Sequence, residues 1–349
     1  MTDISFELQA GPLRKGKLKT THGEVTTPCI VPLLMQGTLG PVDAATLFTT
    51  GVRIVAADGL ELMVAPGSNV LKASHGLANF LGWPGVTLTF SGLHLTTEKL
   101  KKNASRLGFR YQEPITKADN RMDATSAAQL QRAMHSDLPI AAFQNISYYA
   151  PVDDLAIAAK INSDLQHQEQ ALLPTTIPAI NGGGIKAVRK QFISNWQSLK
   201  AAFLTQFSQT DFAEWKRIVQ ENFAFLPHAC LRIIVADNAA ELLAALRLGA
   251  DIIVTGLPLV DAVQGLAYSH EGPIRIKEAI YQSDMHQLAG HSVAYWHYLH
   301  HEGANAATRG LTINNLQCLL QAVDRDVQSS DVEYLQAKLC LTGQNGGNK

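Results

Sequence analysis

Short apolar runs alternate with longer amphipathic segments along most of this 349-residue chain. Apolar runs of about four to eight residues between turn residues are typical of buried strands, and a 3.6-residue apolar period is typical of helices. Strands are therefore predicted at 29–34, 52–59, 85–92, 138–145, 175–184, 230–237 and 251–258. Helices are predicted at 40–51, 68–82, 123–136, 153–173, 186–204, 211–225 and 238–250, with Ser68 or Asn69 as the N-cap of the second.

The predicted strands are almost continuously apolar, which favours a parallel sheet covered by helices on both faces. No GxGxxG motif follows the first strand, which counts against a dinucleotide-binding sheet. At this length we expect an α/β protein, a (β/α)8 TIM barrel with insertions. The barrel is predicted to span residues 1–280 and a helical C-terminal region 281–349, whose last residues, 343–349, are expected to be disordered.

Composition adds few constraints. The chain is 46% hydrophobic and 17% charged, so a large core can form. Its 29 Lys and Arg nearly balance its 30 Asp and Glu, so any basic surface must be local; Lys99, Lys101 and Lys102 form such a cluster, unless they are simply a solvated helix face. The four cysteines have no short spacing, as in proteins of a reducing compartment. With no apolar leader or membrane-length run, we expect a soluble, cytoplasmic protein without a membrane partner.

The stretch "VTLTFSGLHL" (86–95) raises the question of function. An enzyme of this fold carries polar, reactive side chains where its strands end. Here the strand ends in Phe90, and Leu93 and Leu95 follow closely.

Four segments together resemble the tRNA-guanine transglycosylase (queuine tRNA-ribosyltransferase) family, in the family's order. They are "GKLKTTHGEVTTPCIVPLLMQGTLGPV" (16–42), "NFLGWPGVTLTFSGLHL" (79–95), "LRLGADIIVTGLPLVDAVQGLAYSHEGPIRIKEAIYQSD" (246–284) and "AYWHYLHHEGAN" (294–305). The resemblance implies a (β/α)8 barrel that exchanges a guanine in tRNA for a 7-deazaguanine base such as queuine. It implies a double displacement, in which one aspartate attacks the ribose C1′ and a second acts as acid and base.

The sequence departs from that family at the positions that carry the chemistry. Phe90 stands where the family's "DSGGFQ" motif opens with the acid/base aspartate, although Ser91 and Gly92 remain. Val254 takes the place of the nucleophile, and Gln144 that of a base-recognising aspartate. The family's zinc cysteines are replaced by "SDMHQLAGHS" (283–292), which has none, so no metal or other cofactor is expected.

Loss of both carboxylates indicates a non-catalytic relative, similar to the accessory subunit of the eukaryotic enzyme. The expected partners are a catalytic transglycosylase homologue or a second copy of this chain, with tRNA as a further ligand. The degenerate pocket would be formed by Asp58, Phe90, Ser91, Gly92, Gln144, Gly182, Gly183 and Val254.

Two other functions stay open. The chain could be an active transglycosylase with displaced carboxylates, Asp58 and Asp261, although either acid could instead cap a helix or turn. It could also be a stand-alone barrel for a purine-like ligand, lined by Phe90, Gln144 and Gly183. A structure discriminates among these three functions by showing whether four acids converge or scatter: Asp58, Glu61, Asp251 and Asp261.

Two further patterns each have a structural alternative. The "NGGG" turn (181–184) could bring backbone N–H groups against a base or phosphate, or could be a tight turn. His297 and His301 share a helix face at a spacing that metal sites use, but with no cysteine or suitable acid beside them we favour a packing role.

Overall fold

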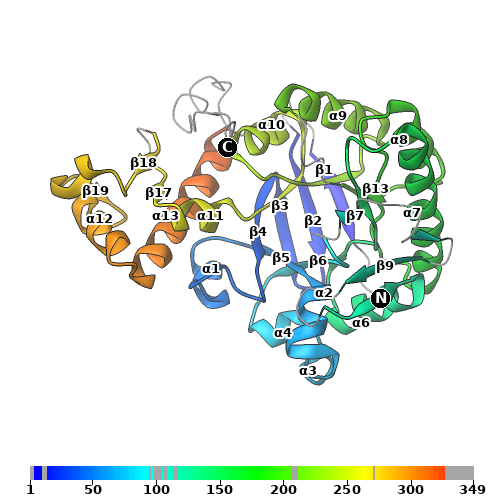
Figure 1. The fold of residues 1–349 in the computed structure, drawn as a ribbon, viewed down its shortest axis with the longest axis horizontal. Helices are drawn as coiled ribbons and strands as arrows, with labels where there is room; N and C mark the ends of the chain where they lie inside the picture. The colour runs from blue at the N-terminus through cyan, green and yellow to red at the C-terminus, as the bar shows by residue number, and fades with distance from the viewer. Residues whose placement is uncertain are drawn as a thin grey trace.

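The central sheet of the computed structural model has eight strands, all parallel, and its two ends meet (Figure 1). Residues 4–9, 14–93, 96–97, 104–105, 108–112, 117–205, 211–269 and 272–326 are described. The strand order is β11-β6-β5-β4-β16-β15-β14-β13, and a parallel bridge between Ile140 and Ile177 joins the first strand to the last. This closure confirms the predicted (β/α)8 barrel. The strands are β4 (Cys29–Leu34), β5 (Ile54–Asp58), β6 (Val86–Phe90), β11 (Leu138–Pro139), β13 (Ala179–Ile180), β14 (Ala201–Leu204), β15 (Leu231–Val235) and β16 (Ile252–Thr255).

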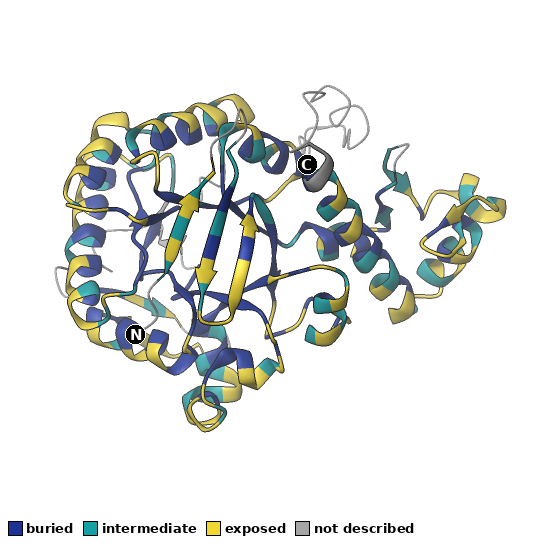
Figure 2. Cartoon of the chain, turned by 180° about the vertical axis from the view of Figure 1, so that it is seen from behind, coloured by how far each residue is buried: buried dark blue, intermediate teal, exposed yellow. Residues whose placement is uncertain are grey.

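Helices surround the barrel with their apolar faces turned inward (Figure 2). Asp43, Asp123, Asp211 and Asn238 each accept a hydrogen bond from the first turn of a helix, as expected of N-cap residues. The α-helices are α1 (Ala44–Thr49), α2 (Gly59–Leu62), α3 (Ser68–Ala73), α4 (Leu77–Leu81), α6 (Ala124–Met134), α7 (Val152–Leu172), α8 (Lys186–Ser194), α9 (Phe212–Phe225), α10 (Ala239–Leu248), α11 (Leu257–Val263), α12 (Val293–His301) and α13 (Asn305–Asp326). A π-helical turn spans Met63–Gly67 and a 3-10 helix Ala279–Ser283.

The barrel interior is filled by side chains from alternate strand positions. On β6, Val86, Leu88 and Phe90 join the interior cluster, whereas Thr89 on the opposite face bonds Gln131 of α6. This alternation is the normal period of a strand. The barrel is therefore a packed core rather than a channel.

Antiparallel strands cover the end of the barrel where the parallel strands begin. The hairpin of β2 (Gly16–Thr20) and β3 (Gly23–Thr27), with β1 (Ser5–Leu8) beside β2, adds Leu18 and Val25 to the interior cluster. Its turn is held by Asp137, which precedes β11 and bonds His22 at 2.8 Å. Arg14, which precedes β2, bonds Asp251, the residue before β16, at 2.8 and 2.9 Å. Two buried carboxylates thus anchor this cap.

Smaller strands lie in the connections of the barrel. A three-stranded antiparallel sheet lies in the connection between β6 and α6. It consists of β8 (Ala104–Ser105), β9 (Gly108–Gln112) and β10 (Asp119–Met122). The remaining two-stranded pairs are β7 (Thr96–Thr97) with β12 (Asn145–Ile146), β17 (Leu266–Ala267) with β18 (Ile274–Arg275), and β19 (Gln287–Leu288) with β20 (His291–Ser292).

After α11 the chain forms a lobe that projects to one side of the barrel (Figure 1). Ile276, Leu288 and Trp296 form its small buried cluster. Helix α13 then returns, and its Leu316 and Leu319 enter clusters that pack the barrel strands against their helices. The domain boundary at residue 280 stays a prediction, and the predicted disordered tail, 343–349, lies outside the described residues. Among the helices that the structure describes, none is long and apolar enough to cross a membrane.

Two predicted elements are wrong. The segment 186–204 is not one helix, because Ala201–Leu204 forms the barrel strand β14; a short buried apolar run carries no period that separates strand from helix. The helix predicted at 68–82 is divided into α3 and α4 by His75 and Gly76, whose φ angles are 57° and 111°. Its N-cap is Gly67, which precedes both residues proposed for that position.

Candidate functional site

The carboxyl ends of the parallel strands form the mouth of the barrel, where active sites of this fold lie. The structure brings Asp58 and Phe90 together there, because the two residues are paired at the last register position of β5 and β6. Val254 lies on β16, and its side chain belongs to the same interior cluster as Phe90.

An aromatic cluster occupies the space inside the mouth. The Phe90 ring packs edge-on against Phe203, with centroids 5.2 Å apart, and Phe143 lies 5.6 Å from Phe203 on another side. Phe90, Phe203 and Val254 have an exposed fraction of 0%, and Phe143 of 1%. A side chain without accessible surface borders no space that can hold even a water molecule. In the part of the chain that the structure describes, Phe90 and Val254 therefore border no open space for a base.

Asp58 uses its carboxylate to hold backbone. One oxygen accepts the N–H groups of Leu60 and Gly92, each at 3.0 Å, and the other accepts the N–H of Leu93 at 2.8 Å. Asp58 is thereby the N-cap of α2 and also ties down the turn after β6. Gly92 has a φ of 103°, a conformation that glycine adopts without strain.

Asp261 lies on α11 and bonds the hydroxyl of Tyr268, a side chain packed in the helix layer outside the barrel. The backbone of Tyr268 is held in turn by Asn314 and Asn315 of α13, each at 2.8 Å. Burial raises the pKa of Asp261 above its ordinary value. The contacts of Asp261 thus lie towards α13, whereas those of Asp58 lie at the mouth.

The other predicted pocket residues are bound to neighbouring parts of the chain. The Ser91 hydroxyl accepts a hydrogen bond from the Gln131 amide at 2.9 Å. The backbone of Gln144 is held by Asn162 of α7, with hydrogen bonds of 2.9 and 3.0 Å. A Cβ added to Gly182 would lie 2.9 Å from the Arg189 side chain, and one added to Gly183 would lie 3.0 Å from Leu155. The glycines of "NGGG" therefore face close-packed side chains of this protein.

A cluster of charged residues that the sequence pattern did not single out stabilises this glycine turn. Arg189 is completely buried and bonds both the carbonyl of Gly183 and, at 2.7 Å, Glu221. Arg217 bonds the carbonyl of Gly184 at 3.1 Å and also contacts Glu221 and Glu214. The Arg217 guanidinium lowers the pKa of Glu214 to about 2. The 3- and 4-residue spacing of these α9 charges was the available sequence signal.

The resemblance implies zinc donors in the lobe after α11. Segment 283–292 has no thiol; His286 bonds Asp284 at 2.6 Å, and His291 stacks on Tyr295 with ring centroids 4.6 Å apart. His297 bonds the carbonyl of Ile276 at 2.6 Å. No group of three or more His, Cys, Asp or Glu side chains in the described part of the chain could hold a metal ion. These residues do not fit the zinc site. The lobe is stabilised instead by packing and by the Trp296 indole, which donates a hydrogen bond to the Leu288 carbonyl at 2.7 Å.

Comparison with known proteins agrees with this fold. The sequence model of the family described as queuine tRNA-ribosyltransferase matches residues 10–329. The queuine tRNA-ribosyltransferase of Nitrosospira multiformis is 24% identical, over 96% of this chain and 98% of that protein. Those of Methylobacillus flagellatus, 25% identical over 88% of each chain, and Aromatoleum aromaticum, 24% identical over 90% of this chain and 91% of that protein, are similar. With a match that covers nearly the whole barrel and its C-terminal helices, the chain belongs to the queuine tRNA-ribosyltransferase family.

Proposed function

We propose that this protein is a non-catalytic subunit in queuosine-type tRNA modification, which acts in the cytoplasm with a catalytic homologue on tRNA. The observation that carries the proposal is the complete burial of Phe90 and Val254 in the barrel core. These are the positions that match the family's two catalytic aspartates.

Base exchange requires a nucleophile that attacks the ribose carbon and a group that moves a proton to and from the base. Hydrocarbon side chains can do neither. The nearest acid, Asp58, already accepts three backbone N–H groups. Using it as a nucleophile would break the cap of α2 and release the turn after β6.

The alternative of displaced carboxylates has little support, because the four candidate acids scatter. Asp58 lies at the mouth, and Asp251 lies at the opposite end of the barrel, bonded to Arg14. Asp261 bonds Tyr268 outside the barrel. Glu61 follows Asp58 on α2. No two of these four acids share a hydrogen-bond partner among the described contacts.

The alternative of a purine-binding barrel is weakened by the burial of Phe90. A ligand lined by Phe90, Gln144 and Gly183 would need accessible surface on Phe90, which has none. Gly183 is instead packed against Leu155.

Exposed apolar side chains along the chain from α11 to α12 support a protein partner. Large exposed apolar residues concentrated in one region are typical of interaction surfaces. In this region they are Val260, Val263, Ile280, Met285, Tyr295 and Tyr298, with exposed fractions from 41% to 78%.

The test is exchange of labelled guanine in tRNA by three samples: this protein alone, a homologue with intact aspartates that co-purifies with it from native cells, and the two together. We expect no exchange by this protein alone, and more exchange by the complex than by the homologue alone. Exchange by the protein alone, or absence of any such homologue from the purified assembly, contradicts the proposal.

A further inference from the structure

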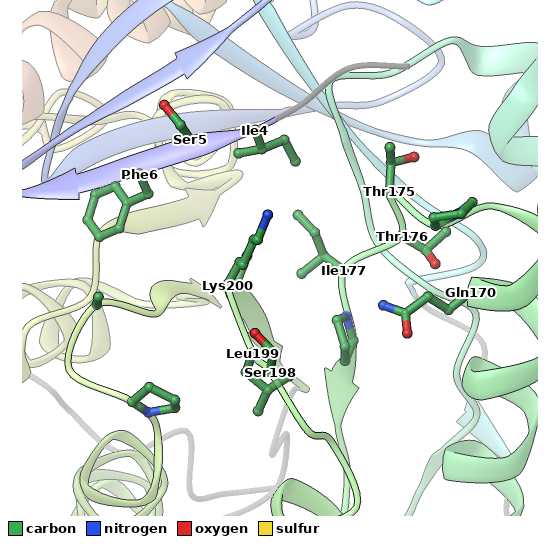
Figure 3. A pocket seen from close by; sticks show the side chains of 15 residues that line it. Ile4, Ser5, Phe6, Gln170, Thr175, Thr176, Ile177, Ser198, Leu199 and Lys200 are labelled. Carbon is green, nitrogen blue, oxygen red and sulfur yellow. The ribbon is translucent and has the colours of Figure 1, made fainter.

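A cavity of about 650 Å³ lies at the end of the barrel opposite the mouth. It opens between β1 and the segments that lead into β13, β14 and β15 (Figure 3). Ile4 and Phe6 form its β1 side, Ile177 and Leu199 lie on its barrel side, and Gln170 comes from α7. Its volume is within the range of about 300–1,000 Å³ that is typical of small-molecule sites.

The lining combines apolar walls with one cation. In Figure 3 the Lys200 side chain extends into the cavity, with its amine between Ile4 and Ile177. The Thr175 hydroxyl and the Gln170 amide lie on the same lining. Among the residues that the structure describes, no Asp or Glu lines the cavity, and Lys200 takes part in none of the ion pairs.

We propose that this cavity binds a small organic monoanion, with a carboxylate at the Lys200 amine and an apolar body against Ile4, Phe6 and Ile177. One cation compensates one negative charge, so a carboxylate fits better than a doubly charged phosphate ester. The apolar body gains free energy by leaving water for the hydrophobic walls. Because the site lies away from the mouth, this proposal is independent of the function proposed above.

The first experiment is a calorimetric titration of the full chain with octanoate, octanamide and octyl phosphate. Octanamide has the same chain without the charge, and octyl phosphate has a second charge. We expect octanoate to bind and the other two to bind more weakly. Methyl NMR signals of Ile4 and Ile177 should shift on addition of octanoate.

The second experiment compares Lys200→Met with Lys190→Met, a matched change at an exposed lysine on α8 that does not line the cavity. Met keeps most of the aliphatic stem and removes the charge. We expect Lys200→Met to weaken octanoate binding about tenfold or more, as for loss of a hydrogen bond to a charged group, and Lys190→Met to bind like the wild type. The proposal is overturned if octanoate does not bind, if octanamide binds equally well, or if both variants bind octanoate like the wild type.

Discussion

Asp58 and Phe90 are opposite partners at the last paired position of β5 and β6, and both side chains are buried at the mouth of the barrel. The Asp58 carboxylate accepts the N–H groups of Gly92 and Leu93, which begin the connection after β6. The Phe90 ring packs against Phe203 from the far side of the barrel. Both side chains thus make contacts that stabilise the rim.

Replacing Phe90 with Asp should destabilise the protein and create no activity. The change removes a completely buried ring and puts a carboxylate into the core, so we expect a loss of about 3–5 kcal/mol or more in the free energy of unfolding. Urea denaturation measures this loss. Phe212→Asp is the matched control, because Phe212 is 45% exposed at the start of α9, and should change stability little. A folded Phe90→Asp, Val254→Asp double variant that exchanges guanine would contradict this prediction, because it would show that the core around these positions can admit a base.

Replacing Asp58 with Ala should cost about 1–3 kcal/mol, because buried backbone N–H groups lose their acceptor. Amide hydrogen exchange should accelerate first at Gly92 and Leu93. Asp58→Asn keeps one acceptor oxygen and should cost less. Equal stability of Asp58→Ala and the wild type would show that the cap contributes nothing.

Asp261 and Tyr268 should behave as one structural pair. We expect Asp261→Asn and Tyr268→Phe each to lower the free energy of unfolding by about 1–3 kcal/mol, and the double variant to lose clearly less than the sum. Denaturant unfolding of the four proteins in this cycle measures the coupling. Additive losses would argue against the pair. Base exchange by this protein alone that is abolished by Asp261→Ala would restore Asp261 as a nucleophile.

Glu169 should make the protein less stable as the pH rises. Burial raises the pKa of this α7 side chain to about 8; one carboxyl oxygen accepts the N–H of Ala142 at 2.8 Å, and the other has no partner. Between the ordinary value of 4.5 and about 8, the folded state keeps a proton that the unfolded state releases. Stability therefore falls across this window, by at most about 1.4 kcal/mol per pH unit.

Unfolding of wild type and Glu169→Gln from pH 5 to 9 tests this dependence. Glutamine does not titrate, so the variant should gain stability relative to the wild type as the pH rises to about 8, and the difference should then level off. Glu278→Gln, at an exposed position, is the control and should show no such trend. Parallel profiles of the wild type and Glu169→Gln would mean that Glu169 titrates normally.

Much of the fold could be predicted because strand and helix periods are local properties. The apolar run predicted as a strand at 29–34 is β4. Asp211 caps α9, the helix predicted at 211–225. One of the two exceptions was Ala201–Leu204, whose four apolar residues become a strand only through pairing with β13 and β15. Because this segment was predicted to be helical, the place of Phe203 in the aromatic cluster of the mouth could not be predicted.

The sequence by itself determined that Phe90 and Val254 are hydrocarbon side chains, and its resemblance to the family predicts that they match the two reactive carboxylates; this prediction needs no coordinates, because it rests on residue identity in a motif. Only the tertiary structure decided what Asp58 and Asp261 do. At the rim, Asp58 accepts hydrogen bonds from residues that lie 34 and 35 positions further along the chain. Asp261 accepts one from Tyr268, whose backbone is held by α13. Which groups converge depends on strand register and helix packing between distant segments, and the local pattern of polar and apolar residues does not encode these contacts one by one.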